Sequence, residues 1–310
     1  METAAEILGT RYPIIQGGMA QISMAPLAAA VSEAGGLGVI AAASLNAEET
    51  RREIRRAREL TDKPFAVNVP VRSPFADDIM AVIIEEKPAF AITAAGDPSR
   101  FMAPLKEAGI KVISVVASPK QAKKMETLGA DLVVAEGHES GGHVGLLTTM
   151  ALIPQVVEAV DIPVIAAGGI ATGRGMAAAM QLGASGVQMG TYFMVAAEST
   201  MHDNCRKAVA EAKAEDAVVV GARAKRAVRC LKNSLTKEYD KLDLLAVDMD
   251  AYAKLRNEAM TKAVVDGDIE NGSLSLGQIA GLVREIKPAA ELVADIVADY
   301  NAVINKLPIL

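Results

Sequence analysis

Asp131-Leu-Val-Val-Ala-Glu-Gly-His-Glu-Ser-Gly-Gly-His-Val-Gly145 joins a short apolar run to a turn that is rich in glycine and holds two histidines. The apolar run predicts a buried strand, because it is short, continuous and rich in valine. Glycine lets a backbone approach a ligand closely and adopt positive φ. A histidine beside such glycines can exchange a proton near neutral pH. The stretch therefore predicts a ligand site at the carboxyl end of a strand.

Two later apolar runs end in the same kind of junction. They are Pro163-Val-Ile-Ala-Ala-Gly-Gly169 and Gly186-Val-Gln-Met-Gly-Thr191. The carboxyl ends of parallel strands meet at one end of a barrel or one edge of a sheet. The three junctions together therefore predict a cofactor site that contains one acid/base residue.

Short apolar runs alternate with amphipathic stretches through the first two thirds of the chain. We expect eight strands, at Ile14–Gln16, Leu37–Ala41, Phe65–Val69, Phe90–Thr93, Lys111–Val116, Leu132–Ala135, Val164–Ala167 and Gly186–Met189. Helical patterns lie between them, for example at Ala47–Leu60, Ser118–Leu128 and Ala151–Val160. Continuous apolar strands separated by helices indicate a parallel sheet covered on its faces. Eight such units predict an α/β fold of the (β/α)8 TIM barrel type. A doubly wound open sheet is the alternative.

The pattern changes after Met201. Residues 201–269 are rich in charged residues and helix formers, for example at Cys205–Ala214 and Val247–Ala263, and have no comparable strand rhythm. We therefore expect a barrel formed by residues 1–200 and 270–310, with an inserted, mainly helical lid domain at 201–269. Within the last part, Ile279–Ile286 and Pro288–Ile304 have helical patterns.

The composition excludes several classes of protein. The 310 residues are 51% apolar and carry a formal net charge of -6, which argues against a nucleic-acid or polybasic membrane surface. Cys205 and Cys230 lie far apart, so neither a disulfide framework nor a metal site is indicated. No basic segment leads into an apolar run at the amino terminus, and no apolar run approaches the ~20 residues of a membrane span. We expect a cytoplasmic protein.

The last two junctions fit a phosphate site. Gly168, Gly169 and Gly173 follow the seventh expected strand, and Gly190 and Thr191 follow the eighth. Barrels often bind phosphate on these two loops, through backbone N–H groups that glycine leaves accessible. A single pair would be read as ordinary turn glycines, but two consecutive loops favour phosphate.

The candidate acid/base residue is His143, which lies between glycines after the sixth expected strand. His138, nearer to the strand, is a weaker candidate. Gly141 and Gly142 would let the turn approach a cofactor. Glu136 could orient a histidine or bind a ribityl hydroxyl, and the alternative is that it caps the next helix.

Other predicted cofactor contacts come from the first, third and eighth strands. Gly17, Gly18 and Met19 open the first loop, where glycine admits a close approach of the backbone. Asn68 ends an apolar strand, and its amide needs a partner, which a flavin edge or a neighbouring loop backbone would provide. Gln188 is expected to point into the barrel mouth.

The remaining candidates are weaker and concern a substrate. Arg226 and Arg229 form part of a basic cluster in the expected lid, which is either a solvated face or a site for a phosphate-bearing substrate. His202 lies at the junction of barrel and lid, and Ser273 and Gln278 lie in a loop at the expected barrel mouth.

These residues together resemble the flavin-dependent enoyl-acyl-carrier-protein reductase II family, within the nitronate monooxygenase-like group of barrel flavoproteins. The resemblance covers nearly the whole chain. Its motifs are Tyr12–Met19, Ala34–Gly38, Asp62–Phe65, Ser73–Phe75, Ala135–Gly137, Gly141–His143, Ile162–Ile170, Gln188–Thr191, Lys232–Asn233, Asp266–Asp268 and Gly277–Gly281.

The resemblance implies one FMN per barrel, with its phosphate on the loops around Gly168, Gly169, Gly190 and Thr191. It implies transfer of hydride from NADH or NADPH through the flavin to a trans-2-enoyl thioester in fatty acid synthesis. His143 matches the family's active-site histidine. The substrate would be carried by acyl carrier protein or a related thiol. The resemblance also implies a homodimer and, as in some members, activation by a monovalent cation.

Two alternative functions stay open. In a nitronate monooxygenase, His143 would act as a base on an alkyl nitronate, and oxygen would accept the electrons. A flavin- or phosphate-binding barrel without catalysis is the third reading.

Overall fold

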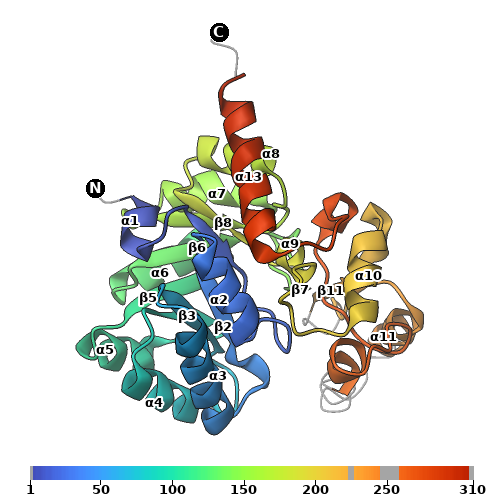
Figure 1. Ribbon diagram of the computed structural model, residues 1–310, viewed down its shortest axis with the longest axis horizontal. Coiled ribbons are helices and arrows are strands. Elements are labelled where there is room, and N and C mark those ends of the chain that lie inside the picture. The colour runs from blue at the N-terminus through green and yellow to red at the C-terminus, as the bar shows by residue number, and fades with distance from the viewer. Residues whose placement is uncertain (1–2, 223–226, 245–257, 307–310) are drawn as a thin grey trace.

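The computed structural model describes residues 3–222, 227–244 and 258–306. Eight parallel strands lie at the centre of this part of the chain, with helices packed around them (Figure 1). They are β1 (Ile14–Gln16), β2 (Gly38–Ala41), β3 (Phe65–Pro70), β4 (Phe90–Ala94), β5 (Lys111–Val116), β6 (Leu132–Glu136), β8 (Val164–Ala167) and β9 (Gly186–Met189). Every strand that the sequence analysis expects is present, within one residue at each end.

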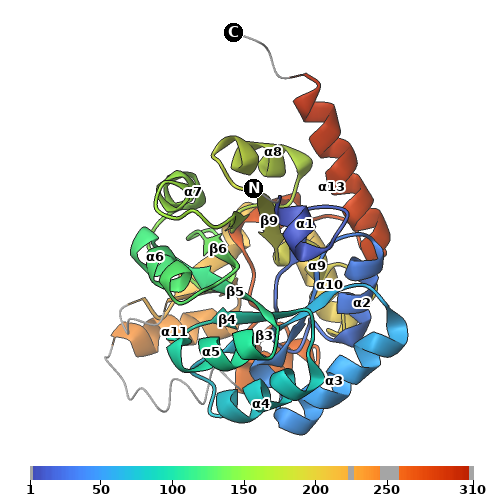
Figure 2. The same cartoon turned by 90° about the vertical axis from the view of Figure 1, so that its left-hand side faces the viewer.

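The eight strands close into a barrel. Their order is β1-β9-β8-β6-β5-β4-β3-β2. The two ends of this order meet through backbone hydrogen bonds, from Gln16 N to Leu37 O at 3.0 Å and from Leu37 N to Ile14 O at 2.8 Å. Figure 2 shows the helices arranged around the strands. The predicted (β/α)8 barrel is therefore confirmed, and the open sheet is excluded.

Helices follow the strands around the barrel. They are α2 (Ala25–Glu33), α3 (Ala47–Leu60), α4 (Ala76–Glu86), α5 (Ser99–Glu107), α6 (Pro119–Thr127), α7 (Thr149–Val157), α8 (Gly173–Gln181) and the short α9 (Thr191–Met194), with a 3-10 turn η1 (Ala42–Ser44). The sequence sets their ends locally: at α3, Asn46 Oδ1 accepts from Glu49 N, and Glu49 Oε2 accepts from Asn46 N, both at 2.9 Å.

Two helices at the chain ends complete the barrel domain. Ala4 and Leu8 of α1 (Ala4–Leu8) pack with the inward-facing strand residues, so α1 fills the amino-terminal end of the barrel. The last helix, α13 (Ala289–Ile304), packs against α8. It confirms the helix predicted at the end of the chain.

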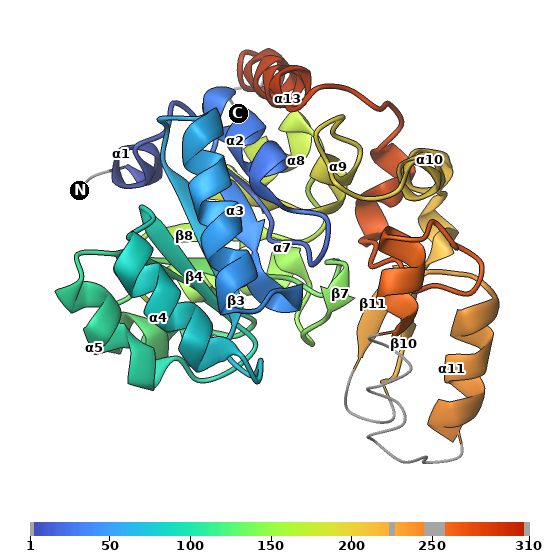
Figure 3. The same cartoon turned by 60° about the horizontal axis from the view of Figure 1, so that its bottom comes forward.

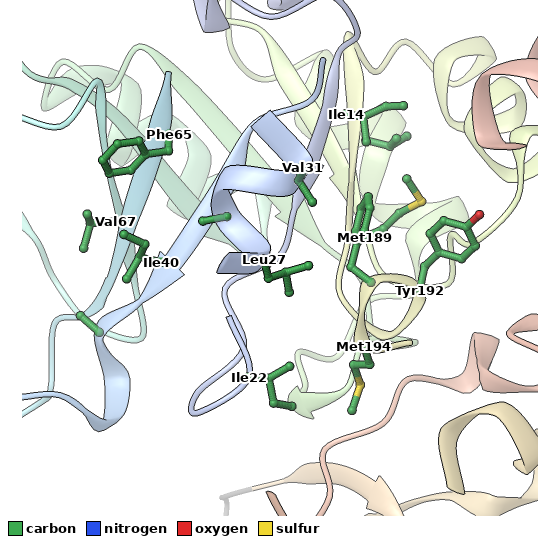
Figure 4. Close-up of a cluster of buried hydrophobic side chains, with 14 of the residues drawn as sticks. Ile14, Ile22, Leu27, Val31, Ile40, Phe65, Val67, Met189, Tyr192 and Met194 are labelled. Atoms are coloured by element: carbon green, nitrogen blue, oxygen red, sulfur yellow. The ribbon is translucent and has the colours of Figure 1, made fainter. Parts of the chain in front are cut away.

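Strand residues alternate between two apolar cores. The inward-facing set includes Ile15, Val39, Ala66, Val134 and Ile165. The outward-facing set packs against the helices. Figure 4 shows part of this outer core, in which Leu27 and Val31 of α2 lie among outward-facing strand side chains. Because the strands are buried on both faces, their sequences are mostly apolar.

One glycine of the outer core offers a test of this packing. A Cβ at Gly38 would lie 1.8 Å from the Ala28 carbonyl oxygen, so α2 and β2 would have to move apart. We expect Gly38→Ala to lower the free energy of unfolding by about 3 kcal/mol, measured by urea denaturation. Gly175→Ala is the control, since its Cβ meets nothing closer than 3.4 Å. Equal effects of the two changes would contradict the close contact.

The expected lid segment contains strands that the sequence analysis did not predict. It comprises α10 (Asp203–Glu211), η2 (Ala214–Asp216), β10 (Ala217–Val220), β11 (Val228–Leu231) and α11 (Ser234–Leu244), and residues 258–264 are also helical. β10 pairs with β11, and β11 pairs with the two-residue strand β7 (Gly142–His143) that follows β6. Figure 3 shows this small sheet and α11 beside the barrel. A lid function for the segment stays a prediction.

Two helix predictions need correction or fall partly outside the structure. The predicted helix at Ile279–Ile286 is wrong: only a 3-10 helix, η3 (Gln278–Leu282), is present. Contacts with residues 212 and 214 compete with helix formation in this segment. A Cβ at Gly281 would lie 3.2 Å from Ala214 N, and Arg284 donates to Ala212 O at 2.8 Å. Most of the predicted helix Val247–Ala263 lies outside the described residues. Among those described, no helix is long and apolar enough to cross a membrane.

Candidate functional site

Three polar side chains point into the carboxyl-terminal mouth of the barrel. Strand alternation places Asn68 two residues beyond inward-facing Ala66, and Glu136 two residues beyond inward-facing Val134. Gln188 pairs in register with inward-facing Ile15 on one side and Ala167 on the other. The same Ala167 pairs with Glu136, so Gln188 and Glu136 lie in one row across three strands. The predicted positions at the mouth are thus brought together.

The amides of Asn68 and Gln188 are available to a ligand. Their side chains are only 9% and 8% exposed, and neither amide makes a hydrogen bond to another of the described residues. Buried amides normally have partners. Two such groups facing the mouth are therefore the structural observation that fits a polar, planar cofactor such as a flavin.

The first loop runs against the third and eighth strands. A Cβ at Gly18 would lie 2.8 Å from Asn68 Cβ, and one at Gly17 would lie 3.2 Å from Gly190 Cα. The loop is fixed from behind, because the buried Gln16 side chain donates to Gly17 O and to Ser23 Oγ. Close packing of the loops thus accounts for glycine at these two positions, and their contact with a cofactor stays a prediction.

Glu136 has an unusual protonation equilibrium. The residue is half-buried at the mouth, and protein atoms are packed densely around its carboxyl group. This burial raises the pKa of Glu136 to about 7, and the neighbouring Ser140 hydroxyl opposes the rise. Near neutral pH the group can therefore either donate or accept a hydrogen bond toward a ligand.

We expect the stability of the cofactor-free protein to depend on pH through Glu136. A raised pKa means that the folded state holds the proton more tightly, so stability falls as the pH rises from about 4.5 to about 7. Glu136→Gln should remove this loss and be more stable than the parent at pH 8 by roughly 3 kcal/mol, with little difference at pH 4.5. Urea unfolding at both pH values measures the effect.

Glu86→Gln provides a control of opposite sign. Burial acts to raise the Glu86 pKa, but hydrogen bonds from Arg55, Arg51 and Arg58 outweigh it and lower the pKa. Glu86→Gln should therefore be less stable than the parent at pH 8, by an amount that shrinks as the pH falls through the ordinary glutamate range. A Glu136→Gln variant that behaves in the same way would refute the raised pKa.

The glycines that follow β8, the seventh barrel strand, pack against the loop that follows β6. Gly168 and Gly169 have φ of 90° and 72°, and a Cβ at Gly168 would lie 2.8 Å from Gly137 O. The Thr149 hydroxyl donates to Gly168 O at 2.8 Å. Only glycine suits both positions without strain. Their N–H groups remain candidates for the phosphate.

Gly173, by contrast, has a packing role. A Cβ there would lie 2.0 Å from Tyr300 N of α13. The amino end of α8 is already capped, because Thr172 Oγ1 accepts from Gly175 N and Asp299 Oδ2 accepts from Arg174 N, each at 3.1 Å. Packing alone therefore accounts for glycine at position 173, and its role in phosphate binding stays a prediction.

The eighth-strand loop has room for a ligand. A Cβ at Gly190 would meet nothing closer than Met19 Sδ at 3.8 Å, and the φ of Gly190 is -95°. The next residue, Thr191, accepts a hydrogen bond at its Oγ1 from Gly277 N at 2.9 Å. The protein's own atoms thus leave space beside Gly190, as a phosphate site requires.

The turn that carries His143 follows β6 and is held by several contacts. His143 is exposed and lies on β7, and Gly142 before it has a φ of 75°. A Cβ at Gly141 would lie 2.9 Å from Gly277 N. Earlier in the turn, His138 Nδ1 donates to Gly145 O at 2.6 Å. His138 therefore braces the turn, while His143 is presented outward.

Sequence reasoning missed Glu139 and Thr149, which hold this turn in place. Glu139 accepts from Thr149 N at 2.9 Å, which ties the turn to the start of α7. The Glu139 carbonyl also accepts from Gln278 N at 3.0 Å. The partners lie 10 and 139 residues apart in the chain, so no local pattern signals these contacts.

The predicted substrate residues are scattered. His202 caps α10, where its Nδ1 accepts from Asn204 N at 3.2 Å, and Ser273 is buried with its N donating to Ala259 O. Gln278 is exposed and adjoins the mouth through Glu139. Arg226 lies outside the described residues. A substrate role for each of these stays a prediction.

Arg229 is not part of a solvated face. It is 2% exposed, and its Nη1 donates to the carbonyls of His138 and Ser140, the latter at 3.0 Å. Burial lowers the pKa of its guanidinium, and the charge of nearby Glu139 acts in the opposite direction. Of the two readings of the basic cluster, the exposed one is wrong for Arg229, because the β11–β7 pairing buries its side chain.

A closed (β/α)8 barrel with glycine loops at its mouth, and two buried amides there that bond to no other described side chain or backbone group, is typical of a protein that binds a cofactor. A family model described as nitronate monooxygenase matches residues 2–81 and 77–299. The chain therefore belongs to the nitronate monooxygenase family.

Three similar proteins illustrate the range of this family. The structure of FabK from Thermotoga maritima has a TM-score of 0.95 and 43% sequence identity, and covers 99% of this chain and 98% of its own. A (3aS,4S,5R,7aS)-5-hydroxy-7a-methyl-1-oxo-octahydro-1H-indene-4-carboxyl-CoA dehydrogenase from Mycobacterium tuberculosis is 34% identical, covering 95% of this chain and 94% of its own. A probable nitronate monooxygenase from Staphylococcus saprophyticus is 33% identical, covering 97% of this chain and 98% of its own. The family and FabK are FMN enzymes, so the chain belongs among FMN oxidoreductases.

Proposed function

We propose that this protein is an FMN-dependent, NAD(P)H-consuming reductase of trans-2-enoyl thioesters, with enoyl-acyl carrier protein as the favoured substrate class. The observation that carries the proposal is the likeness to FabK, an enoyl-acyl-carrier-protein reductase II, at 43% identity over 99% of this chain. That span includes the segment whose strand β11 pairs with the strand of His143. The likeness thus extends to the chain that surrounds the acid/base residue.

The residues at the mouth fit FMN. Asn68, Gln188 and Glu136 would bind its polar ring edge and ribityl chain, because their side chains face the mouth. Backbone N–H groups at Gly168, Gly169 and Gly190 would hold its phosphate. FMN, when bound, supplies the two-electron transfer between nicotinamide and substrate.

His143 would supply the proton that this reaction needs. Reducing a 2,3 double bond places a hydride on the β-carbon and a proton on the α-carbon of the thioester. The exposed imidazole of His143 can carry that proton near neutral pH. Protonation as negative charge develops on the thioester carbonyl would stabilise the transition state.

The proposal has further parts, which follow from the family resemblance of the sequence. The donor would be NADH or NADPH, and the acyl group would be carried by acyl carrier protein. We propose a cytoplasmic homodimer whose activity responds to a monovalent cation.

An anaerobic assay tests the proposed reaction. NAD(P)H should rapidly bleach the absorbance of the purified yellow protein, and crotonyl thioester should restore it. The proposal is wrong if nicotinamide has no effect while an alkyl nitronate bleaches the protein.

That second outcome would support a nitronate monooxygenase. The 33% identity to the Staphylococcus protein over 97% of this chain favours it as the second candidate. His143 would then take a proton from the substrate, since a base is needed there. Turnover with neither class of substrate and no donor would leave the non-catalytic binding barrel.

A further inference from the structure

The turn that carries His143 is held by chain segments far away in the sequence. β7 consists of two residues and has one strand partner among the described residues, β11: Gly142 pairs with Arg229, and His143 pairs with Val228. Val144 N also donates to Ala227 O at 3.2 Å. The barrel strands thus determine where the turn begins, at Glu136, but not where His143 lies.

Arg229 makes the side-chain contacts that complete this attachment. Its Nη1 donates to the carbonyls of both His138 and Ser140, and the side chain is 2% exposed. Burying a cation is costly unless its donors are used. Nε of Arg229 is buried without a hydrogen-bond partner among the described residues. The guanidinium therefore holds the turn through buried hydrogen bonds, at a cost in desolvation free energy that an exposed arginine would not have.

We propose that Arg229 is a positioning residue for His143, which fixes the turn 138–143 against β11 so that the imidazole is held ready for proton transfer. The inference rests on the proposed role of His143. Through Arg229, strand β11 of the expected lid segment is held against the turn that carries the acid/base residue. Placement errors near 1 Å are enough to slow a reaction by about 100-fold.

Another arginine in the chain provides a matched control. Arg206 Nη1 donates to the carbonyls of Ala197 and Ser199, at 3.1 and 2.8 Å, so it also grips a turn through two carbonyls. That turn follows α9 and does not carry His143. Arg206→Met therefore measures the general effect of losing such a contact.

The experiment compares Arg229→Met, Arg229→Lys and Arg206→Met as FMN-loaded protein. Hydrogen–deuterium exchange measures the amides of residues 138–144, and fluorescence titration measures FMN affinity. Steady-state assays with crotonyl thioester give kcat, KM and the pH profile. We expect Arg229→Met to speed exchange in 138–144 by about tenfold or more and to lower kcat by about 100-fold, with FMN affinity changed less than about threefold. Arg229→Lys should recover part of the loss, and Arg206→Met should change neither 138–144 exchange nor kcat.

Two results would overturn the proposal. One is unchanged exchange of 138–144 in both Arg229 variants. The other is a fall in kcat that merely follows loss of FMN. If Arg229→Met does not fold, Arg229→Lys decides, because it keeps the charge and loses the planar fork. The exchange measurement does not depend on the reaction, so failure of the proposed enoyl reduction would be seen separately, as a parent protein that does not turn over crotonyl thioester.

Discussion

Replacing His143 by alanine is expected to lower the rate of enoyl thioester turnover by about 100- to 10,000-fold, while the protein still binds FMN. The imidazole is exposed and lies beyond the buried part of the mouth, so its loss leaves no cavity in the core. The step that needs a proton should slow, whereas bleaching of the flavin by NAD(P)H should not. Rapid-mixing absorbance measurements follow the two steps separately.

Two controls make the His143 result specific. Added imidazole should partly restore turnover of His143→Ala, because it replaces the missing acid. Leu146→Ala should have little effect, since this side chain lies three residues further along and is 96% exposed. A His143→Ala variant with parental turnover would remove the proton-transfer role and leave the cofactor site unaffected.

Gly190→Val should weaken FMN binding by about 100-fold or more while the protein remains folded. The position has an ordinary φ of -95°, and a Cβ there meets no protein atom closer than 3.8 Å, so the fold tolerates a side chain. The new methyl groups would fill the space expected for the phosphate and prevent one or two charged hydrogen bonds, each worth about 1.5–3 kcal/mol. Fluorescence titration with FMN measures the loss.

The control for Gly190→Val is Gly175→Ala, whose amide is already capped by Thr172. Thermal unfolding without FMN should give similar midpoints for parent, control and variant. Undiminished FMN affinity in Gly190→Val would move the phosphate away from the eighth-strand loop, and the loop around Gly169 would then need the same test.

The candidate site was only partly predictable. Asn68, Gln188 and Glu136 could be placed at the mouth because a polar residue near the end of an otherwise apolar strand is conspicuous, and strand alternation then fixes the side on which it lies. Gly173 illustrates the limit of such reasoning, since packing against α13 requires glycine there just as a phosphate would. Arg229 shows the same limit. A lysine- and arginine-rich stretch is typical of a solvated surface, and nothing near it in sequence indicates the two carbonyls that it binds.

The sequence by itself determined the barrel, its eight strand positions and the residues that end those strands. These follow from local patterns, because a strand buried on both faces is mostly apolar. The tertiary structure alone decided the pairing of β7 with β11, the burial of Arg229 and the loss of the predicted helix at Ile279–Ile286. Those features depend on contacts between segments tens of residues apart, and their energies outweigh weak local preferences that a sequence pattern can register.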